Sequence, residues 1–585
     1  MITEPKIPRK LERIEQQYMG LRFETVGTVD VAMATTTEYR REEPVDLDWA
    51  PMPVGTRWGG DWQTAWLRGD AGLPECCVGR KVFIRAKTNV ETLFFADGEA
   101  KGVFDGNHPY RCLTLSGEAT HSYHLAFEAY AGHTFPGTQP YDSRPAIVDN
   151  GQTFGGIEIA LEREDVTAFC FDLRVLRSLG HALDEHSLRR GRITAALARV
   201  FEIVPAAPAE VPEEQWRPAL AAARDIMRPL LASQNGPTVP KFGLLGHSHI
   251  DTAWLWPLAE TWRKCARTFS SMCNLMEQYP EVTFLQSAPC HTEVLRSEYP
   301  GIFTKVQELA AAGRWEPNGA MWVEPDCNLV SGESFVRQLL VGQRSTREMF
   351  GYTSDTLWLP DVFGYSAALP QILQQAGVEF FVTTKISWND TTRFPFDTFE
   401  WRGMDGTGVV SHFNQIQGWP DPAALLDRWR WIQHKDSQDR FLYCYGWGDG
   451  GGGPAAEQME VTRRIGDLEG CPQAEHTTVT EFMQGVRDDM GELPVYRGEL
   501  YLEFHRGTLT SIAGIKRGNR KSELAMRDAE FLCTLGALRG VSYPHGELLE
   551  LWKRLLINQF HDIHPGSSIA EVNDEALADF AAIIE

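Results

Sequence analysis

Two hydrophobic patterns divide the chain. Residues 1 to about 175 contain short runs in which apolar and polar positions alternate, for example 81–86 and 91–98, with glycine-containing turns between them. A period of two is typical of half-buried strands, and many short strands of this kind predict an antiparallel β-sandwich. From about residue 241 short continuous apolar runs alternate with helical segments, a pattern typical of a parallel α/β domain. The sequence therefore predicts a multidomain α/β protein.

The α/β region is expected to hold seven strands. They are predicted near residues 242–246, 282–285, 315–321, 356–359, 380–384, 409–413 and 441–446. Seven parallel strands with helices between them indicate a (β/α) barrel, in which all strand ends open on one face that holds the active site. Farther along, amphipathic runs at 523–538 and 546–560 predict a C-terminal helical bundle. The predicted division is an N-terminal β-sandwich (1–176), a helical linker (177–238), the barrel (239–496) and the bundle (497–585).

Composition excludes several classes of partner. The chain has 585 residues, is 43% hydrophobic and 23% charged, and carries a formal net charge of −23. Such acidity disfavours nucleic acid and anionic membrane surfaces, which require a basic patch. No leader precedes the sandwich, no apolar run could cross a membrane, and eleven cysteines lie without CxxC spacing, so we expect a cytoplasmic protein with reduced thiols. The sequence leaves open whether the chain forms a homo-oligomer.

The first polar cluster follows the apolar run 242–245. His249 and Asp251 stand two positions apart, so in an extended segment both side chains leave the same face and can converge on one cation. An imidazole and a carboxylate make half of a tetrahedral site for a metal such as zinc. Trp254 and Trp256 follow at once, and such rings suit the faces of sugars. The alternative is a strand-end turn with a hydrogen-bonded His and Asp and two core tryptophans.

Two further clusters follow predicted strands. Asp361 comes directly after the strand at 356–359, where a carboxylate is held in a defined position and can serve as a nucleophile or a metal ligand. Its alternative role is to cap the next helix. Asp449 precedes four consecutive glycines, but no Gly-Lys-Ser/Thr follows them, so a phosphate-binding loop is excluded. The glycines let the backbone approach a ligand closely while Asp449 protonates a leaving group, or else they form a simple turn.

In this order, the clusters resemble glycoside hydrolase family 38, the retaining α-mannosidases, and in particular its cytosolic-type branch. The resemblance rests on segments 249–257, 358–361, 448–454 and 558–562, and extends from about Lys241 to Ile569 with a weaker likeness over the sandwich. Several spaced motifs in the right order are far more specific than any one of them. The resemblance implies that a carbohydrate is the substrate and that the enzyme removes α-linked mannose.

The resemblance also implies a role for individual residues. The ligands of one divalent metal, Zn²⁺ or in this branch Co²⁺, would be His249, Asp251, Asp361 and His561. Asp361 would also be the nucleophile, and Asp449 would be the general acid and base. The substrate-binding residues would be Trp254, Phe363, Asp562 and, near the pocket, Asp326. Retaining hydrolysis needs two carboxylates roughly 5 Å apart, so that one protonates the departing oxygen while the other attacks the anomeric carbon.

Two other readings stay open. A metal-dependent polysaccharide deacetylase would also use His and Asp, but it needs neither an acid in a glycine-rich loop nor a nucleophilic Asp at the metal. A non-catalytic carbohydrate-binding chain is the second alternative. It is favoured by one departure from the family, whose members continue past the helical bundle into large β-rich domains, whereas this sequence ends at Glu585. Some sugar-facing side chains of the family come from that region.

Overall fold

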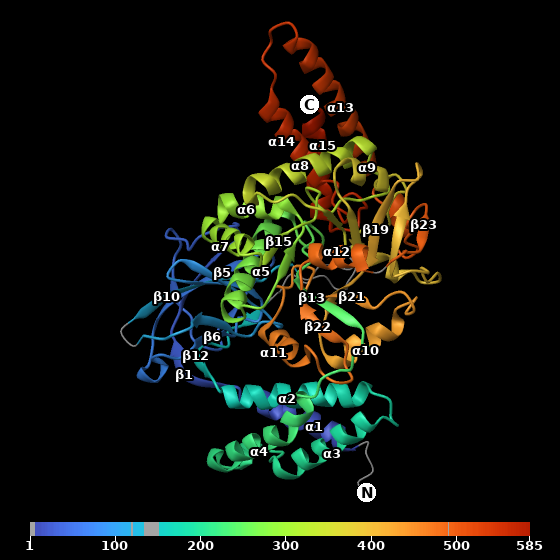
Figure 1. Ribbon diagram of the computed structural model, residues 1–585. Helices are drawn as coiled ribbons and strands as arrows, with labels where there is room; N and C mark the ends of the chain where they lie inside the picture. The colour runs from blue at the N-terminus through green and yellow to red at the C-terminus, as the bar shows by residue number, and fades with distance from the viewer. Residues whose placement is uncertain (1–5, 119–120, 134–150, 490) are drawn as a thin grey trace.

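The computed structural model describes residues 6–118, 121–133, 151–489 and 491–585 (Figure 1). Its N-terminal part contains two antiparallel sheets. The first sheet has the order β1 (Phe23–Val29), β12 (Ile157–Glu162), β6 (Val82–Ala86), β9 (Arg111–Thr114). The second has the order β3 (Ala50–Pro51), β2 (Ala32–Thr36), β5 (Thr64–Gly72), β10 (Ser122–Tyr130), β7 (Glu91–Ala96), β8 (Glu99–Phe104). The short strands β4 (Arg57–Trp58) and β11 (Gln152–Thr153) pair beside them.

Apolar side chains of both sheets share one core. Ile84 and Ile159 from the first sheet and Phe94 and Phe127 from the second are buried in the same cluster. Phe94 and Phe127 stack with their ring centroids 5.0 Å apart. The alternation of apolar and polar positions puts every second side chain into this core, as expected for two packed sheets. The predicted β-sandwich is confirmed.

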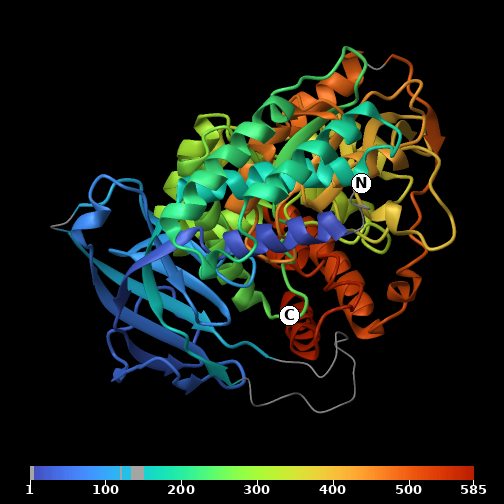
Figure 2. The same ribbon diagram turned by 90° about the horizontal axis from the view of Figure 1, so that it is seen from below.

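Four helices form a layer that lies below the α/β region in Figure 1 and faces the viewer in Figure 2. They are α1 (Lys6–Met19), α2 (Glu164–Ala182), α3 (Leu188–Ile203) and α4 (Glu213–Leu231). Tyr18 of α1 meets the ring of Phe169 on α2 and that of Trp216 on α4 edge to face, at 5.4 and 5.5 Å. Helix α1 and most of α2 thus fall within residues 1–176, although they pack in this layer and not in the sandwich.

The α/β region contains two sheets. One has the order β15 (Trp315–Pro317), β14 (Phe284–Gln286), β13 (Lys241–His247), β21 (Arg440–Tyr445), β20 (Gln415–Gly418), with β22 (Gln473–His476) also paired to β13. The other has the order β16 (Thr356–Trp358), β17 (Phe380–Thr383), β19 (Gly408–Phe413), β18 (Thr398–Arg402), β23 (Val495–Arg497). All seven predicted strands are present. Strands β18, β20, β22 and β23 were not predicted, and β18 runs antiparallel to β19.

The strand pairing does not close these sheets into the single barrel that the sequence predicted. At two places where a closed barrel would need backbone hydrogen bonds between neighbouring strands, a side chain makes the hydrogen bond instead. Between β15 and β16, the Asn318 side-chain oxygen accepts from the Thr356 amide, 3.3 Å away. Between β19 and β21, Nε2 of His412 accepts from the Leu442 amide at 3.2 Å. The strands keep the expected order, but polar side chains join one sheet to the other.

Helices surround these sheets. They are α5 (Leu258–Gln278), α6 (Pro289–Glu298), α7 (Pro300–Ala311), α8 (Gly332–Phe350), α9 (Leu369–Gln375), α10 (Pro422–Trp431), α11 (Ala456–Ile465) and α12 (Val479–Asp489). Helix α5 packs along β8 of the sandwich, where the Val103 amide donates to the Ser271 hydroxyl at 2.8 Å. None of the helices described is long and apolar enough to cross a membrane.

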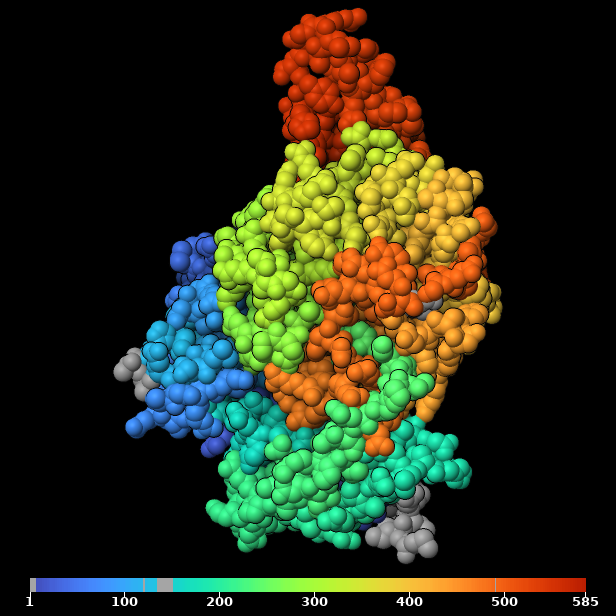
Figure 3. Space-filling model, in the orientation of Figure 1, coloured from blue at the N-terminus to red at the C-terminus, as the bar shows by residue number. Residues whose placement is uncertain are grey.

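The C-terminal part is helical, as expected. It consists of α13 (Ala513–Ala537), α14 (His545–Ile557) and α15 (Ala570–Ile584). The far ends of α13 and α14 project from the body of the protein (Figures 1 and 3). Their inner ends pack on the α/β region, because Trp552 and Phe560 share a buried cluster with Trp322 and Val323. This packing brings the turn after α14, which contains His561 and Asp562, to the ends of the parallel strands.

Candidate active site

Polar residues that follow three of the predicted strands meet in one cleft of about 1080 Å³. Asp251 follows β13, Asp361 follows β16 and Asp449 follows β21, and each of them lines this cleft. Parallel strands present their carboxyl ends at a common edge, which explains how residues far apart in sequence gather there. Asp562 joins them from the turn after α14. The strand-end motifs therefore belong to a single site.

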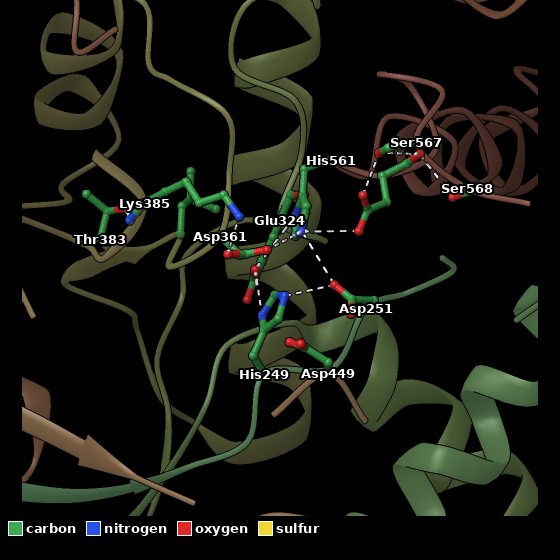
Figure 4. A network of polar contacts seen from close by, with 12 residues as sticks. His249, Asp251, Glu324, Asp361, Thr383, Lys385, Asp449, His561, Ser567 and Ser568 are labelled. Carbon is green, nitrogen blue, oxygen red and sulfur yellow. Dashed lines mark hydrogen bonds and ion pairs between the residues drawn. The ribbon is translucent and has the colours of Figure 1, made fainter. Parts of the chain in front are cut away.

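Two imidazoles and two carboxylates form the centre of this site (Figure 4). Their possible ligand atoms all lie within 4.8 Å of one another, and the residues are His249, Asp251, Asp361 and His561. Nε2 of His249 lies 2.9 Å from Asp251 Oδ1. Nε2 of His561 lies 3.6 Å from the same oxygen and 4.0 Å from Asp361 Oδ2. A mixed nitrogen and oxygen set of this size suits a divalent transition metal.

Glu324 orients both histidine rings. Its carboxylate oxygen Oε2 lies 3.2 Å from His249 Nδ1, and its backbone carbonyl oxygen lies 3.1 Å from His561 Nδ1. When Nδ1 of His561 donates to this carbonyl, Nε2 keeps its lone pair and faces the cluster. That Nε2 atom is buried and has no hydrogen-bond partner among the described residues. An orphaned lone pair beside two carboxylates fits a metal ligand.

The electrostatics of the cluster also favour a cation. Burial raises the pKa of Asp251, but the charge and hydrogen bond of His249, together with the charge of His561, outweigh burial and hold this pKa well below its usual range. Burial lowers the pKa of His249, yet the neighbouring carboxylates of Glu324 and Asp251 raise it well above its usual value. The cluster thus holds excess negative charge that either protons or a metal ion can neutralise.

Asp361 has a second partner, Lys385. The Lys385 ammonium donates to Asp361 Oδ1 at 2.7 Å, while Oδ2 faces His561. Lys385 is only 3% exposed, and it also lies 5.2 Å from the ring centroid of Phe363 and 4.3 Å from that of Trp388. A buried cation beside a carboxylate stabilises its ionised form. Lys385 therefore holds one oxygen of Asp361 at the edge of the cluster, and Asp361 does not cap the next helix, α9, whose N-cap is Ala368.

Asp449 stands at the start of the glycine run in a left-handed backbone conformation, with φ of 52°. The amide of the next residue, Gly450, donates to the His249 carbonyl at 3.1 Å, which ties this loop to the metal-site segment. The Gln417 side-chain amide donates to Asp449 Oδ1 at 2.8 Å. Asp449 is open to the cleft, but the protein walls desolvate its carboxylate and, with the charge of Asp251, raise its pKa to about 6. A carboxyl with this pKa is suited to proton transfer near neutral pH.

The structure brings three of the four predicted substrate-binding residues to the cleft. Trp254, Phe363 and Asp562 line it. Burial and the charge of Asp251 raise the pKa of Asp562 to about 7. Asp326 does not line the cleft and is the exception. Its Oδ1 accepts from the backbone amides of Asn328 and Leu329 at 3.1 and 2.6 Å, so this carboxylate stabilises a buried turn.

Sequence reasoning missed Glu324, Lys385 and Gln417. Glu324 stands two positions before Asp326, which was a predicted site residue, but nothing in the local sequence indicated which of the two acids faces the histidines. Lys385 follows the predicted strand at 380–384, so its place at a strand end was the available signal. Gln417 offered no such signal, because β20 was not predicted. It also adopts a left-handed backbone, with φ of 54°, and such strain clusters at functional sites.

Three family profiles match this chain, in the same order as the parts of the fold. They are "Alpha-mannosidase, jelly roll domain" at residues 25–154, "Glycosyl hydrolases family 38 N-terminal domain" at 240–499 and "Alpha mannosidase middle domain" at 503–585. The second of these covers His249, Asp251, Asp361 and Asp449, and the third covers His561. The second and third profiles thus meet at the cleft that the structure describes.

Relatives with these parts are known. "Alpha-mannosidase 2C1" of Mus musculus is 34% identical over 556 residues, and its Homo sapiens counterpart is 34% identical over 563. The matches cover 92% and 93% of this chain but 52% of either relative, so the chain spans about half the length of these proteins. A crystal structure of an alpha-mannosidase from Enterococcus faecalis V583 has the same fold, with a TM-score of 0.52 at 21% identity over 59% of this chain and 41% of that one. The chain belongs to glycoside hydrolase family 38.

Proposed function

We propose that this chain carries the active site of a retaining α-mannosidase, which hydrolyses terminal α-linked mannose in oligosaccharides or glycosides. The observation that carries the proposal is the cleft that holds the four-residue cluster, with Asp361 among the four, and that a second carboxylate with a raised pKa, Asp449, also lines. Relatives named as alpha-mannosidases support the same activity. Two carboxylates with different environments are what a two-step displacement at an anomeric carbon requires.

A divalent metal ion would be held by His249, Asp251, Asp361 and His561. The mixed nitrogen and oxygen donors favour Zn²⁺, with Co²⁺ as the second candidate. When bound, such an ion supplies positive charge and open coordination positions for the hydroxyls of a sugar. Glu324 orients the two histidine rings for this purpose through its carboxylate and its carbonyl oxygen. Outer partners of this kind usually change metal affinity by about 10- to 100-fold.

Asp361 and Asp449 divide the chemistry between them. The Asp361 carboxylate, held by a hydrogen bond from Lys385, attacks the anomeric carbon, and its oxygen forms a covalent bond to the sugar as the bond to the leaving oxygen breaks. Asp449 gives its proton to that leaving oxygen and then, as a carboxylate, takes a proton from the water that releases the sugar. Trp254, Phe363 and Asp562 are placed to contact the sugar from the cleft walls. Gln417 holds the Asp449 carboxyl in place.

We propose that four parts of the chain together carry this function. We propose the sandwich within 1–176, the helical linker at 177–238, the catalytic region at 239–496 and the helical bundle at 497–585. The bundle contributes to the site directly, since His561 and Asp562 follow α14. A chain without the bundle would therefore lack one proposed metal ligand.

A panel of α- and β-linked aryl glycosides, assayed after loading the protein with Zn²⁺ or Co²⁺, tests the proposal. We expect turnover of α-mannosides alone, with a covalent sugar trapped on Asp361 by a fluorinated mannoside. Release of acetate from acetylated polysaccharide without such trapping would identify a deacetylase instead. A metal-loaded chain that binds mannosides but hydrolyses none would be a carbohydrate-binding protein.

The pH dependence of hydrolysis is expected to follow Asp449. This group donates a proton only while it is protonated, so kcat/KM for phenyl α-mannoside should fall about tenfold per pH unit above the pKa of Asp449, which is about 6 without a bound cation. Positive charge from a metal moves the fall to lower pH. Replacing Gln417 by glutamate removes a hydrogen bond that lowers this pKa and adds negative charge, so in Gln417→Glu the fall should move to higher pH.

The matched substrate for this measurement is the 2,4-dinitrophenyl mannoside. Its leaving group departs without a proton, so its kcat/KM should lack the alkaline fall in both proteins. The titrating group would not be Asp449 if the alkaline decrease in kcat/KM moved to lower pH in Gln417→Glu. The same conclusion would follow if both substrates showed this decrease.

A further inference from the structure

The loop that carries Asp449 is held from two sides. On one side the Gly450 amide donates to the His249 carbonyl at 3.1 Å. On the other, Nε2 of His108, a residue of the N-terminal sandwich, lies 3.1 Å from the carbonyl oxygen of Gly453. His108 is 2% exposed. Among the residues that the structure describes, those that line the cleft all come from positions 251 to 567, so none of the described side chains of the sandwich lines it.

His108 is itself fixed by a tight turn. Its Nδ1 lies 3.0 Å from Asp105 Oδ1, and the same oxygen accepts from the backbone amides of Asn107 and His108 at 2.7 Å. Because the Gly453 carbonyl can only accept a hydrogen bond, Nε2 of His108 must be the donor. The ring is therefore held in one orientation, with its donor directed at the loop.

The glycines are needed where the sandwich approaches the loop. A Cβ atom on Gly452 would lie 2.8 Å from Cε1 of His108 and 2.8 Å from Cγ1 of Val103, closer than real side chains come. Gly452 and Gly453 also have φ of 86° and 78°, in the left-handed region. Val103 lies on β8, which its own amide anchors to Ser271 on α5. The contact is thus a close-packed junction between the sandwich, α5 and the loop.

We propose that His108 is a positioning residue for the general acid. By donating to the Gly453 carbonyl, which also accepts from the Trp447 amide, it adds a restraint from the sandwich to the four-glycine run and so helps to keep the Asp449 carboxyl over the cleft. Restricting a glycine loop matters because glycine has the largest conformational freedom of all residues. The sandwich then contributes to catalysis through a hydrogen bond, although none of its described side chains lines the cleft. This inference rests on the proposed function of Asp449.

Three variants separate the two contacts of His108. His108→Phe keeps a ring but has no donor. His108→Gln places an amide nitrogen where Nε2 was, and so restores the bond to Gly453. His108→Asn places its amide where Nδ1 was, and so keeps only the contact with Asp105. Hydrolysis is compared for phenyl α-mannoside, whose departure needs a proton, and for the 2,4-dinitrophenyl compound, whose departure does not.

We expect kcat/KM for phenyl α-mannoside to fall on the order of 10- to 100-fold in His108→Phe and His108→Asn, a part of the about 10²- to 10⁴-fold that a general acid contributes. The value for the dinitrophenyl compound should stay within about 2-fold, because its departure needs no proton. His108→Gln should recover most of the loss. Equal losses on both substrates, or no difference between His108→Gln and His108→Asn, would overturn the proposal. If His108→Phe does not fold, the Gln and Asn pair decides.

Amide hydrogen exchange tests the same contact without any substrate. Exchange at 447–453 should be faster in His108→Phe and His108→Asn than in wild type, and near wild type in His108→Gln. Unchanged exchange in all three variants refutes the restraint even if the wild type hydrolyses mannosides. If exchange is faster in His108→Phe and His108→Asn but the wild type hydrolyses no mannoside, the proposed function is refuted while the restraint by His108 stands. His121→Gln is the matched control, because His121 pairs with Asp97 on the exposed surface of the same sandwich at 2.9 Å.

Discussion

Replacing Asp361 by alanine is expected to abolish hydrolysis of α-mannosides, with a loss in kcat of about 10⁴-fold or more. The change removes the proposed nucleophile and one of four clustered ligand groups, and it leaves the buried Lys385 ammonium without its carboxylate partner. The loss should be equally severe for phenyl and dinitrophenyl mannosides, because a good leaving group cannot replace a missing nucleophile. Turnover is measured after metal loading, with the metal content determined by elemental analysis.

Two companion variants make this result specific. Asp361→Asn keeps an oxygen for the metal, so its metal content should stay nearer that of the wild type while turnover is still lost. Asp326→Asn changes a buried acid that does not line the cleft, and its hydrogen-bonded turn can be kept by the amide oxygen. We expect it to retain turnover. Asp361→Ala with activity within about 10-fold of wild type would exclude Asp361 as the nucleophile, and loss of activity in Asp326→Asn would restore that residue to the site.

Removal of the metal by a chelator is expected to abolish turnover and to lower the melting temperature. The buried cluster holds excess negative charge, and without a cation its carboxylates repel one another and Asp562. A metal that binds only the folded protein stabilises it by about 2.7 kcal/mol when its free concentration is a hundred times Kd. Activity, melting temperature and metal content are measured before chelation, after it, and after addition of Zn²⁺ or Co²⁺.

The matched variant for metal removal is His561→Ala. It lacks the imidazole whose buried Nε2 has no partner among the described residues, while the other three ligand groups remain. Its melting temperature should respond little to the chelator, because it binds the metal weakly from the start. Full turnover by a chelated, metal-free wild type would mean that the four residues form a hydrogen-bonded cluster with no metal role.

Local pattern was enough to predict most of the secondary structure around the site. Each of the seven predicted strands was a short apolar run ended by polar or turn-forming residues, and such runs depend only on neighbours in the chain. All seven are present. Strands β20, β22 and β23 were missed because they are short and partly exposed, for example the half-exposed Gln473–His476, and so carry little apolar signal, whereas β18 was missed although its Phe399 and Trp401 are buried.

Closure of the sheets could not be predicted in this way. The same seven strands would satisfy the pattern in a closed barrel or in two sheets, because strand pairing at the gaps involves backbone groups that every residue has. In the structure the side chains of Asn318 and His412 make hydrogen bonds across these gaps. Nothing in their local sequence indicated which distant amide they would meet.

Asp326 and Glu324 illustrate the same limit inside the site. Both are acids of one short segment, and both are buried. Only the packing of the turn after α14 against this segment places Glu324 beside the two histidines and leaves Asp326 to stabilise its own turn. Asp326 thus lies outside the lining of the cleft, and local sequence does not encode which of the two neighbouring acids faces the histidines.

The sequence by itself determined the kind of protein: the positions of the parallel strands, the motifs at their ends and the resemblance to glycoside hydrolase family 38. These features are carried by residues close together in the chain. Only the tertiary structure decided which acid faces the histidines, that Lys385 and Gln417 hold the two central carboxylates, and that His108 of the sandwich meets the glycine loop. Those contacts join residues from 24 to 345 positions apart, and their geometry depends on how whole elements pack.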